Sequence, residues 1–344
     1  MKRRKFIKQG VVATTGLLVT PSLIVANTPQ RITSKKNNYM VYEIIIIGGG
    51  PAGMSAALVL GRSRIKTLLL NTENPRNLVT THSHGFLTQD GKHPSEIFKV
   101  AKEELNKYPS VTYQKEKAID VKRDNNGFTV KTENNTFKAK RVVIATGHKD
   151  NIGSIGIEGL IEVYGKSVYP CPFCDGFEMA DKKLAVFGDA MMAPMFSKTI
   201  SHWSNDVIVF TNGEKVEDKE LLSNLTKKGI QIVDKKIKKL ISIKGQLTGV
   251  ELIDDTIIER EGGFLPDTKS TESTDFAKKM KIPTEIGHFG MEFYKVDENK
   301  ETEIKGFYII GDARTGWSGV ASSVAEGSEV AAAITHQIIE ENWE

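Results

Sequence analysis

Cys171 and Cys174 are separated by two residues, and an acid, Asp175, follows the second of them directly. Two thiols at this spacing can close a small disulfide ring, and the first thiol of such a pair usually has a lowered pKa. A neighbouring carboxyl group can supply a proton to a leaving thiolate. The string therefore favours reversible chemistry between a dithiol and a disulfide.

Half of a zinc site and an inert structural disulfide are the two alternatives for this pair. A zinc site needs further ligands, and the sequence has neither a second cysteine pair nor a nearby histidine pair at ligand spacing. A structural bridge would suit an exported protein, so it stays open at this point. No metal is expected, and two cysteines exclude a multi-bridge disulfide framework.

A glycine-rich turn near the start of the predicted folded region could bind a cofactor that carries electrons. An apolar run over 42–47 predicts a buried strand, and an alanine-rich helix follows the turn. This is the G-x-G-x-x-G arrangement in its dinucleotide-binding context, in which the backbone and the helix N-terminus receive a pyrophosphate. The predicted contacts are Gly48, Gly50, Pro51, Ala52 and Gly53.

The second strand of this unit, predicted over 66–70, ends at Asn71. Units of this kind often have an acid there for the adenosine ribose. Asn71 can still hydrogen-bond a hydroxyl group, and Glu73 is the nearby alternative.

Two later segments indicate which dinucleotide binds. A buried strand from Arg141 ends in Ala145, Thr146 and Gly147, and another from Gly306 ends in Gly311 and Asp312. With the first motif they resemble the three fingerprints of two-dinucleotide-binding flavoproteins, in which FAD lies across the first domain. The resemblance implies that Asp312 bonds the ribityl chain. It also implies that a helix from about Gly319 points its N-terminus at the flavin, where a positive dipole end stabilises the reduced form.

The string from Cys171 to Phe177, placed after an FAD half, resembles the low-molecular-weight (class II) thioredoxin reductases. The resemblance covers nearly all of the chain beyond residue 40. It implies an α/β protein with two Rossmann-like dinucleotide-binding domains, the second inserted into the first, and a homodimer. It also implies that Cys174 faces the flavin, that Cys171 exchanges with substrate, and that Asp175 gives and takes the proton.

The predicted FAD-binding domain comprises 41–155 and 286–340, and the predicted NAD(P)H-type domain with the cysteine pair comprises 156–285. The inserted domain is expected to end after a hinge-like stretch, 262–266. The family's domain insertion permits rotation that presents the pair alternately to flavin and substrate. Charged stretches at 214–220 and 234–239 are interpreted as solvated faces of a helix and a strand, so no nucleic-acid partner is expected.

A second glycine turn follows a strand predicted over 183–187. Gly188, Asp189 and Ala190 match the family's NADPH motif, Gly-x-Gly-x-x-Ala, except that Ala190 replaces the second glycine. A Cβ at that point should crowd a pyrophosphate. The next strand, 207–210, is followed by no arginine that could clamp a 2′-phosphate. NAD(P)H is expected from the resemblance, and a domain without tight nucleotide binding is the alternative.

Strings at 74–77, 83–91 and 211–213 resemble a side branch of the family that includes dithiol oxidases. They make Arg76, Asn77 and His84 candidate cofactor contacts, with a solvated loop histidine as the alternative for His84. Members of that branch often have histidine at the position of Asp175, so an acid at this position resembles the reductases more.

The expected function is an FAD-dependent thiol–disulfide oxidoreductase. It would pass electrons between flavin, the cysteine pair and a disulfide or dithiol, either of a thioredoxin-like protein or of a small molecule, with NAD(P)H as reductant. The alternative is an exported dithiol oxidase that uses oxygen as acceptor.

The 344 residues suggest two ordinary domains, and 26% charged residues exclude a polytopic membrane protein. The formal charge of +4 has a local origin. Five basic residues lie in the first ten positions: Lys2, Arg3, Arg4, Lys5 and Lys8. An uncharged stretch follows to residue 26, and no acid occurs before Glu43. Without 1–26, the loss of five positive charges takes +4 to −1.

This pattern resembles a twin-arginine export signal over 1–26, followed by a polar linker over 27–40. A retained membrane anchor and a basic disordered tail are the alternatives. The twin-arginine machinery carries folded proteins with their cofactors, which agrees with an FAD requirement. The protein is therefore expected outside the cytoplasmic membrane, periplasmic or extracellular, and membrane-anchored if the signal stays uncleaved.

Overall fold

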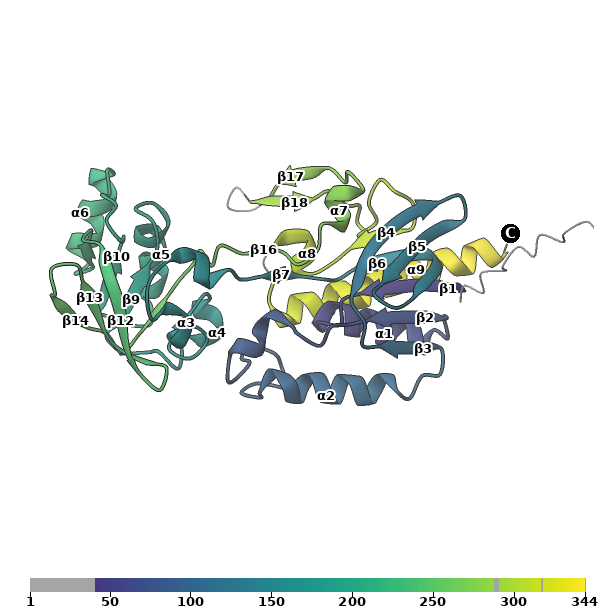
Figure 1. Ribbon diagram of the computed structural model, residues 1–344, viewed down its shortest axis with the longest axis horizontal. Coiled ribbons are helices and arrows are strands. Elements are labelled where there is room, and N and C mark those ends of the chain that lie inside the picture. The colour runs from purple at the N-terminus through teal and green to yellow at the C-terminus, as the bar shows by residue number, and fades with distance from the viewer. Residues whose placement is uncertain (1–40, 288–290, 317, 344) are drawn as a thin grey trace, which may run out of the picture. The chain divides into compact units, whose positions relative to one another are not determined.

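The computed structural model describes residues 41–343, apart from 288–290 and 317 (Figure 1). The predicted export signal, 1–26, and linker, 27–40, lie outside the described residues. Within the described part of the chain, no helix is both long and apolar enough to cross a membrane.

The first domain is built on a seven-stranded sheet in the order β3-β2-β1-β6-β5-β4, with β19 also paired to β6. Its strands are β1 (Val41–Ile47), β2 (Thr67–Leu70), β3 (Val111–Gln114), β4 (Ala118–Asp124), β5 (Gly127–Thr132), β6 (Thr136–Ile144) and β19 (Phe307–Ile309). The strands β3, β2, β1, β6 and β19 are parallel, whereas β4, β5 and β6 pair antiparallel.

The apolar run of β1 is continuous because both faces of the sheet are covered. Ile45 and Ile47 belong to one buried cluster, and Ile44 and Ile46 belong to the other. Successive side chains of β1 therefore point to opposite faces of the sheet, but both sets are apolar, so the sequence shows no alternation of polar and apolar residues. The carboxyl end of β1 points at the first glycine turn, so this packing sets where a dinucleotide can bind.

Helices and two further strands complete the first domain. They are α1 (Pro51–Arg62), η1 (Arg76–Val79), α2 (Pro94–Leu105), α7 (Phe276–Lys279), β17 (Thr284–Ile286), β18 (Glu292–Tyr294), α8 (Asp312–Thr315) and α9 (Val320–Trp343). Helix α1 packs along α9 (Figure 1). A Cβ on Gly327 would lie 2.2 Å from the Ala52 carbonyl oxygen, so a glycine in α9 permits this close approach.

The inserted domain has a parallel five-stranded sheet in the order β11-β10-β9-β15-β8. Its strands are β8 (Val168–Tyr169), β9 (Leu184–Phe187), β10 (Val207–Phe210), β11 (Gln231–Val233) and β15 (Gly262–Phe264). An antiparallel sheet adds β12 (Ile237–Ile243), β13 (Gln246–Leu252) and β14 (Ile257–Glu259). The helices are η2 (Ile152–Ile155), α3 (Leu160–Val163), α4 (Pro172–Asp175), α5 (Met192–Ile200) and α6 (Lys219–Lys227).

The prediction that the stretch 262–266 is hinge-like is wrong. Its first three residues form β15, a buried strand hydrogen-bonded between β9 and β8. A Cβ on Gly263 would lie 2.6 Å from the Ala185 carbonyl oxygen. The glycine therefore serves close packing of neighbouring strands.

The two connections between the domains run side by side as β7 (His148–Lys149) and β16 (Thr271–Glu272), which pair antiparallel. Both predicted boundaries need correction. Phe276 and Ile282, assigned to the inserted domain, lie in the core of the first domain. Ile152 and Ile155, assigned to the first domain, pack against the core of the inserted one. In each case burial of apolar side chains decides the membership, and the inserted domain lies between β7 and β16.

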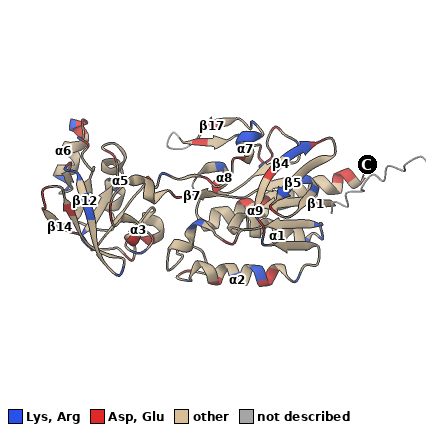
Figure 2. Cartoon of the chain, viewed as in Figure 1, with Lys and Arg blue, Asp and Glu red and all other residues tan. Residues whose placement is uncertain are grey.

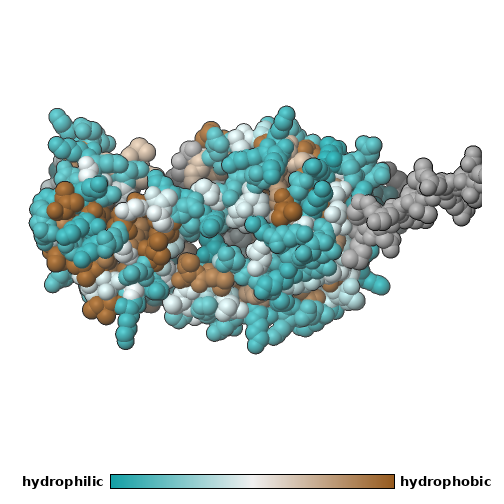
Figure 3. Space-filling view, in the orientation of Figure 1, coloured by the Kyte–Doolittle hydropathy of each residue, from teal (hydrophilic) through white to brown (hydrophobic). Residues whose placement is uncertain are grey.

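Lys and Arg are interspersed with Asp and Glu along the described elements of both domains (Figure 2). Apolar side chains also reach the surface of the domain that carries β12 to β14 (Figure 3). Ile243, Ile253 and Ile257 of this region are each more than half exposed.

Candidate active site

The cysteine pair lies at the carboxyl end of β8, in the turn that begins α4. Pro172 occupies the first helical position, where the missing N–H costs nothing. The backbone N–H groups of Cys174 and Asp175 donate to the Cys171 carbonyl oxygen at 3.3 and 3.2 Å. This single turn brings the two sulfur atoms within hydrogen-bond contact, and both are free thiols in the structure.

The two thiols have opposite acidities. The Cys174 thiol donates to the Cys171 sulfur and, with the backbone N–H groups of Cys174 and Phe173, lowers the pKa of Cys171 to about 7. The same hydrogen bond, together with burial, raises the pKa of Cys174. Cys171 is therefore the thiol of the pair that ionises first, which is the property a nucleophilic thiol needs.

Asp175 has an unusually weak acid group. Burial, the negative charge of the Cys171 thiolate and the carboxylate of Glu178 together raise the pKa of Asp175 to about 7. A group that is half protonated near neutral pH can both donate and accept a proton. The turn thus combines a nucleophile and an acid–base group that titrate in the same pH range.

The Trp203 ring packs against this turn, and nothing in the sequence motif indicated this contact. A Cβ on Gly176 would lie 2.7 Å from a ring carbon of Trp203, so only glycine fits there. The ring of Phe173 meets the Trp203 ring edge-on, with centroids 5.6 Å apart. Phe173 and Phe177 are largely exposed, which leaves aromatic surface beside the thiols.

The first glycine turn is shaped to receive an anion. Gly48 has a φ of +108°, and a Cβ there would lie 2.2 Å from the Ala145 carbonyl oxygen. A Cβ on Gly50 would instead meet nothing within 4 Å, so open space lies where a ligand must approach. Helix α1 has no side-chain cap at Gly50 and no acid in its first turn. Its N–H groups therefore fit the pyrophosphate of FAD.

Replacing Gly50 by alanine should reduce FAD binding without unfolding the protein. The φ of −74° at Gly50 suits alanine, but the added methyl group occupies the space of the pyrophosphate. We expect at least ~10-fold weaker FAD binding, which removes about 1.4 kcal/mol. The ratio of flavin to protein absorbance after purification measures this. Gly153→Ala adds the same methyl group far from the turn; an equal flavin loss in that variant would contradict the assignment.

Asn71 closes the turn instead of leaving its side chain open. Its Oδ1 accepts from the N–H groups of Gly49 (3.2 Å) and Glu73 (3.1 Å), and its Nδ2 donates to the Tyr113 hydroxyl at 3.1 Å. Glu73 is bound by Lys102, Lys115 and Tyr113, and these hydrogen bonds lower its pKa to about 2. A ribose contact by Asn71 stays a prediction; the structure adds a positioning role.

Arg76 connects the flavin side of the domain to both interdomain connections. Its guanidinium lies 2.6 Å from Asp150 and 3.0 Å from Asp312. Burial alone would raise the pKa of Asp150, but hydrogen bonds from Arg76 and Thr268 hold it below its usual value. Arg76 thus orients Asp312, the residue expected at the ribityl chain.

The other predicted cofactor residues lie at the carboxyl ends of β1, β6 and β19. The Ala145 carbonyl oxygen faces Gly48, and the Thr146 hydroxyl lies 3.1 Å from that of Thr274. Gly147 and Gly311 both have a φ of +64°, which favours glycine. The Asp312 carboxylate accepts from the N–H and hydroxyl of Ser318 at 2.6 and 2.7 Å.

Three other side chains border this region. Asn77 lines a cavity of about 270 Å³ that also reaches Gly50. His84 lies on a loop, 3.5 Å from Asp90, and its role at the flavin stays a prediction. His148 packs against the position of Gly316, and its buried Nδ1 has no partner among the described residues. A buried nitrogen without a protein partner fits a site that receives a polar ligand.

Comparison with known proteins identifies the arrangement. The sequence profile of the pyridine nucleotide-disulphide oxidoreductases matches residues 42–327. The chain belongs to this family. It is 27% identical over 311 residues to thioredoxin reductase aclD of Aspergillus oryzae, covering 87% of this chain and 96% of that one. The structure of TrxB from Bacillus anthracis matches with a TM-score of 0.81 at 32% identity, covering 88% and 99%.

An oxidoreductase from Agrobacterium tumefaciens gives a TM-score of 0.79 at 31% identity and covers 87% of this chain and 99% of its own. These matches confirm the predicted thioredoxin-reductase-like family and its two-domain Rossmann-like fold. The protein is a flavin-dependent disulfide oxidoreductase, and FAD is the cofactor that its first glycine turn fits.

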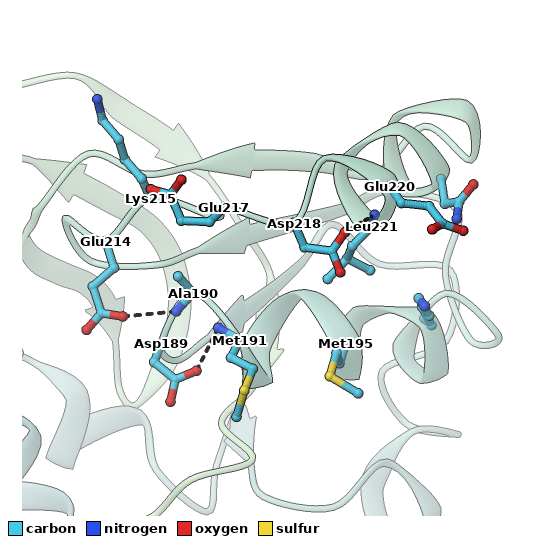
Figure 4. Close-up of a pocket in the computed structure, with 12 residues that line it drawn as sticks. Asp189, Ala190, Met191, Met195, Glu214, Lys215, Glu217, Asp218, Glu220 and Leu221 are labelled. Carbon is cyan, nitrogen blue, oxygen red and sulfur yellow. Dashed lines mark hydrogen bonds between the residues drawn. The ribbon is translucent and has the colours of Figure 1, made fainter.

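The name of the family refers to a pyridine nucleotide, but the second glycine turn of this chain differs from the first in what its backbone N–H groups bind. The Ala190 N–H donates to Glu214 Oε2 at 3.0 Å, and Asp189 Oδ1 accepts from Met191 N–H at 2.9 Å (Figure 4). Gly188 is retained before them at the end of β9. Carboxylates thus hold the N–H groups that a pyrophosphate would need, and the residues of this turn do not fit NAD(P)H.

Proposed function

We propose that this flavin-dependent oxidoreductase exchanges electrons with an external dithiol or disulfide through Cys171, and with FAD through Cys174. The observation that carries this is the single turn in which a nucleophilic thiol and a carboxyl group both have a pKa near 7. Substrates with a thioredoxin-type disulfide, on a protein or a small molecule, match this chemistry.

The exchange starts from the Cys171–Cys174 disulfide when a dithiol is oxidised. A substrate thiolate attacks the Cys171 sulfur, and the sulfur of Cys174 leaves. Because its pKa is raised, Cys174 takes a proton, which Asp175 supplies. The second substrate thiol gives its proton to Asp175 and attacks the substrate sulfur of the mixed disulfide. Cys171 then leaves as a stable thiolate, because its pKa is about 7.

The substrate loses two electrons and becomes a disulfide, while the cysteine pair gains them as a dithiol. FAD, held at the turn from Gly48 to Gly53, would supply the two-electron acceptor through which the Cys171–Cys174 dithiol returns to the disulfide. Oxygen, reduced to hydrogen peroxide, is the terminal acceptor in this direction. The reverse sequence of thiol exchange reduces a substrate disulfide.

We propose the direction from dithiol to flavin, because the second glycine turn does not fit a pyridine nucleotide. A reductase fed by NAD(P)H is the second candidate. It is favoured by Asp175, which the resemblance places with the reductases, and by the parallel sheet retained around β9 and β10.

We also propose that the protein acts outside the cytoplasmic membrane. The twin-arginine-type pattern of its first 26 residues supports this location, and reduced pyridine nucleotides are cytoplasmic. Homodimer formation stays a prediction from family resemblance.

An anaerobic titration of the FAD-loaded protein tests the proposal. We expect a dithiol, and not NADPH or NADH, to bleach the visible flavin absorbance, with peroxide formed when air is admitted. Rapid bleaching by micromolar NADPH would overturn the proposed direction and leave the thiol chemistry standing. A variant with Cys171→Ser and Cys174→Ser is the control; bleaching by dithiol at the wild-type rate in that variant would overturn the role of the pair.

A further inference from the structure

We propose that two of the protein's own carboxylates, those of Glu214 and Asp189, close the second dinucleotide site and exclude NADPH. They do so by occupying the backbone N–H groups at the start of α5. This inference deepens the proposed direction from dithiol to flavin, and it does not depend on the thiol chemistry at Cys171 and Cys174.

The chain contains its own reference for this comparison. Both domains have a parallel strand, a glycine turn and a helix, and α1 and α5 stand at equivalent places. In the turn before α1, the side-chain acceptor among the described residues is the neutral amide of Asn71, which accepts from the Gly49 N–H, and no carboxylate takes part. At α5 the N–H groups of Ala190, Met191 and Met192 each donate to a carboxylate. One turn is left open to an anion, and the other already holds one.

The contacts at the second turn are short. Glu214 Oε2 lies 3.0 Å from the Ala190 nitrogen, at the position of the missing second glycine. Asp189 Oδ1 lies 2.9 and 2.6 Å from the nitrogens of Met191 and Met192. Figure 4 shows the Glu214 carboxylate at the Ala190 nitrogen and the Asp189 carboxylate beside it at the Met191 nitrogen. A pyrophosphate would have to displace both, and its charge would repel them.

The loop after β10 holds Glu214 in this position. The Glu214 N–H donates to the Thr211 carbonyl oxygen at 3.2 Å, and the buried Thr211 hydroxyl donates to the Glu214 carbonyl oxygen. Asn212 Oδ1 accepts from the Ile237 N–H at 3.0 Å, which anchors the same loop to β12. The side chains where a nucleotide-binding unit would contact the ribose or 2′-phosphate instead fix the loop that carries Glu214.

The surrounding charge opposes a polyanionic ligand as well. A cavity of about 850 Å³ lies at this turn, and five carboxylates and two lysines line it. The acids are Asp189, Glu214, Glu217, Asp218 and Glu220, and the lysines are Lys198 and Lys215. NADPH brings a pyrophosphate and a 2′-phosphate, so the excess of negative charge lowers its affinity further.

Calorimetric titration of the FAD-loaded protein with NADPH tests this proposal. We expect the wild type to bind with a Kd weaker than about 1 mM. Glu214→Ala frees the Ala190 N–H, and Ala190→Gly removes the methyl group. The double variant should bind NADPH at least ~10-fold more tightly than the wild type. Glu217→Ala is the matched control, because it removes one negative charge from the same cavity and frees no backbone donor.

Micromolar binding of NADPH to the wild type would overturn the proposal. It would also fail if a folded double variant, with an unchanged thermal midpoint, gained no affinity. An equal gain in Glu217→Ala would show that net charge alone controls binding, and an equal gain in the single variant Ala190→Gly would assign the barrier to the methyl group. Either result would overturn the role of the occupied donors. None of these measurements uses turnover, so a failure here is distinct from a failure of the thiol chemistry.

Discussion

Replacing either Cys171 or Cys174 by serine is expected to lower dithiol-dependent turnover at least ~10³-fold, because the pair acts as one unit. Without a second thiol, neither variant can close the disulfide that receives the substrate's electrons. Oxygen consumption in the presence of a dithiol measures the loss. The two variants should nevertheless differ in a second property, which assigns the role of each thiol.

The reduced Cys174→Ser protein should still attack an aromatic disulfide reagent at neutral pH and form one stable mixed disulfide. Its remaining thiol, Cys171, loses the hydrogen bond from the Cys174 thiol but keeps those from the backbone N–H groups of residues 174 and 173, which still lower its pKa. The Cys171→Ser protein should react more slowly, because burial and the nearby Asp175 carboxylate still raise the pKa of Cys174 after the Cys171 thiol is lost. The opposite order of reactivity would exchange the two assignments.

Asp175→Asn is expected to slow turnover by ~10²-fold or more, the usual contribution of general acid–base catalysis. The amide keeps the size of the carboxyl group but cannot transfer a proton to or from Cys174. The wild-type rate should change around pH 7, where Asp175 and Cys171 both titrate, and the variant should keep only the part that Cys171 contributes.

The same substitution should raise the free energy of unfolding at alkaline pH. Folding raises the pKa of Asp175 from 3.8 to about 7, so the folded protein holds a proton that the unfolded chain releases within that range. Stability therefore falls as pH rises from about 4 to about 7, and the full penalty persists above it. Removing the charge at pH 8 should stabilise the fold by ~2–4 kcal/mol. Denaturant unfolding at pH 4 and pH 8 measures this difference.

Lower turnover together with higher stability at pH 8 in Asp175→Asn would show that this carboxyl group serves function and not folding. Glu178→Gln is the matched control, because Glu178 contributes only the third cause of the raised pKa of Asp175. It should shift the pH profile to lower pH and retain turnover. A loss of stability in Asp175→Asn at pH 8 would contradict the assignment.

Local motifs in the sequence were sufficient for the family, the fold class and the class of enzyme. The Cys171–Asp175 string and the turn from Gly48 to Gly53 act through backbone geometry within a few residues, so their spacing along the chain already implies the arrangement in space. For the same reason the buried run of β1 could be recognised, and Ala190 could be identified as a departure from a dinucleotide turn.

Only the tertiary structure decided which residues surround these motifs. Glu214 reaches Ala190 from 24 residues away, and Arg76 meets Asp312 across 236 residues. The domain boundaries also depended on such contacts, since Phe276 joins the first core by burial and not by local pattern. Hydrogen bonds and apolar burial between distant segments leave no periodic trace in a sequence. The sequence therefore determined the cysteine motif and the family, and the packing decided which carboxylates reach the second glycine turn.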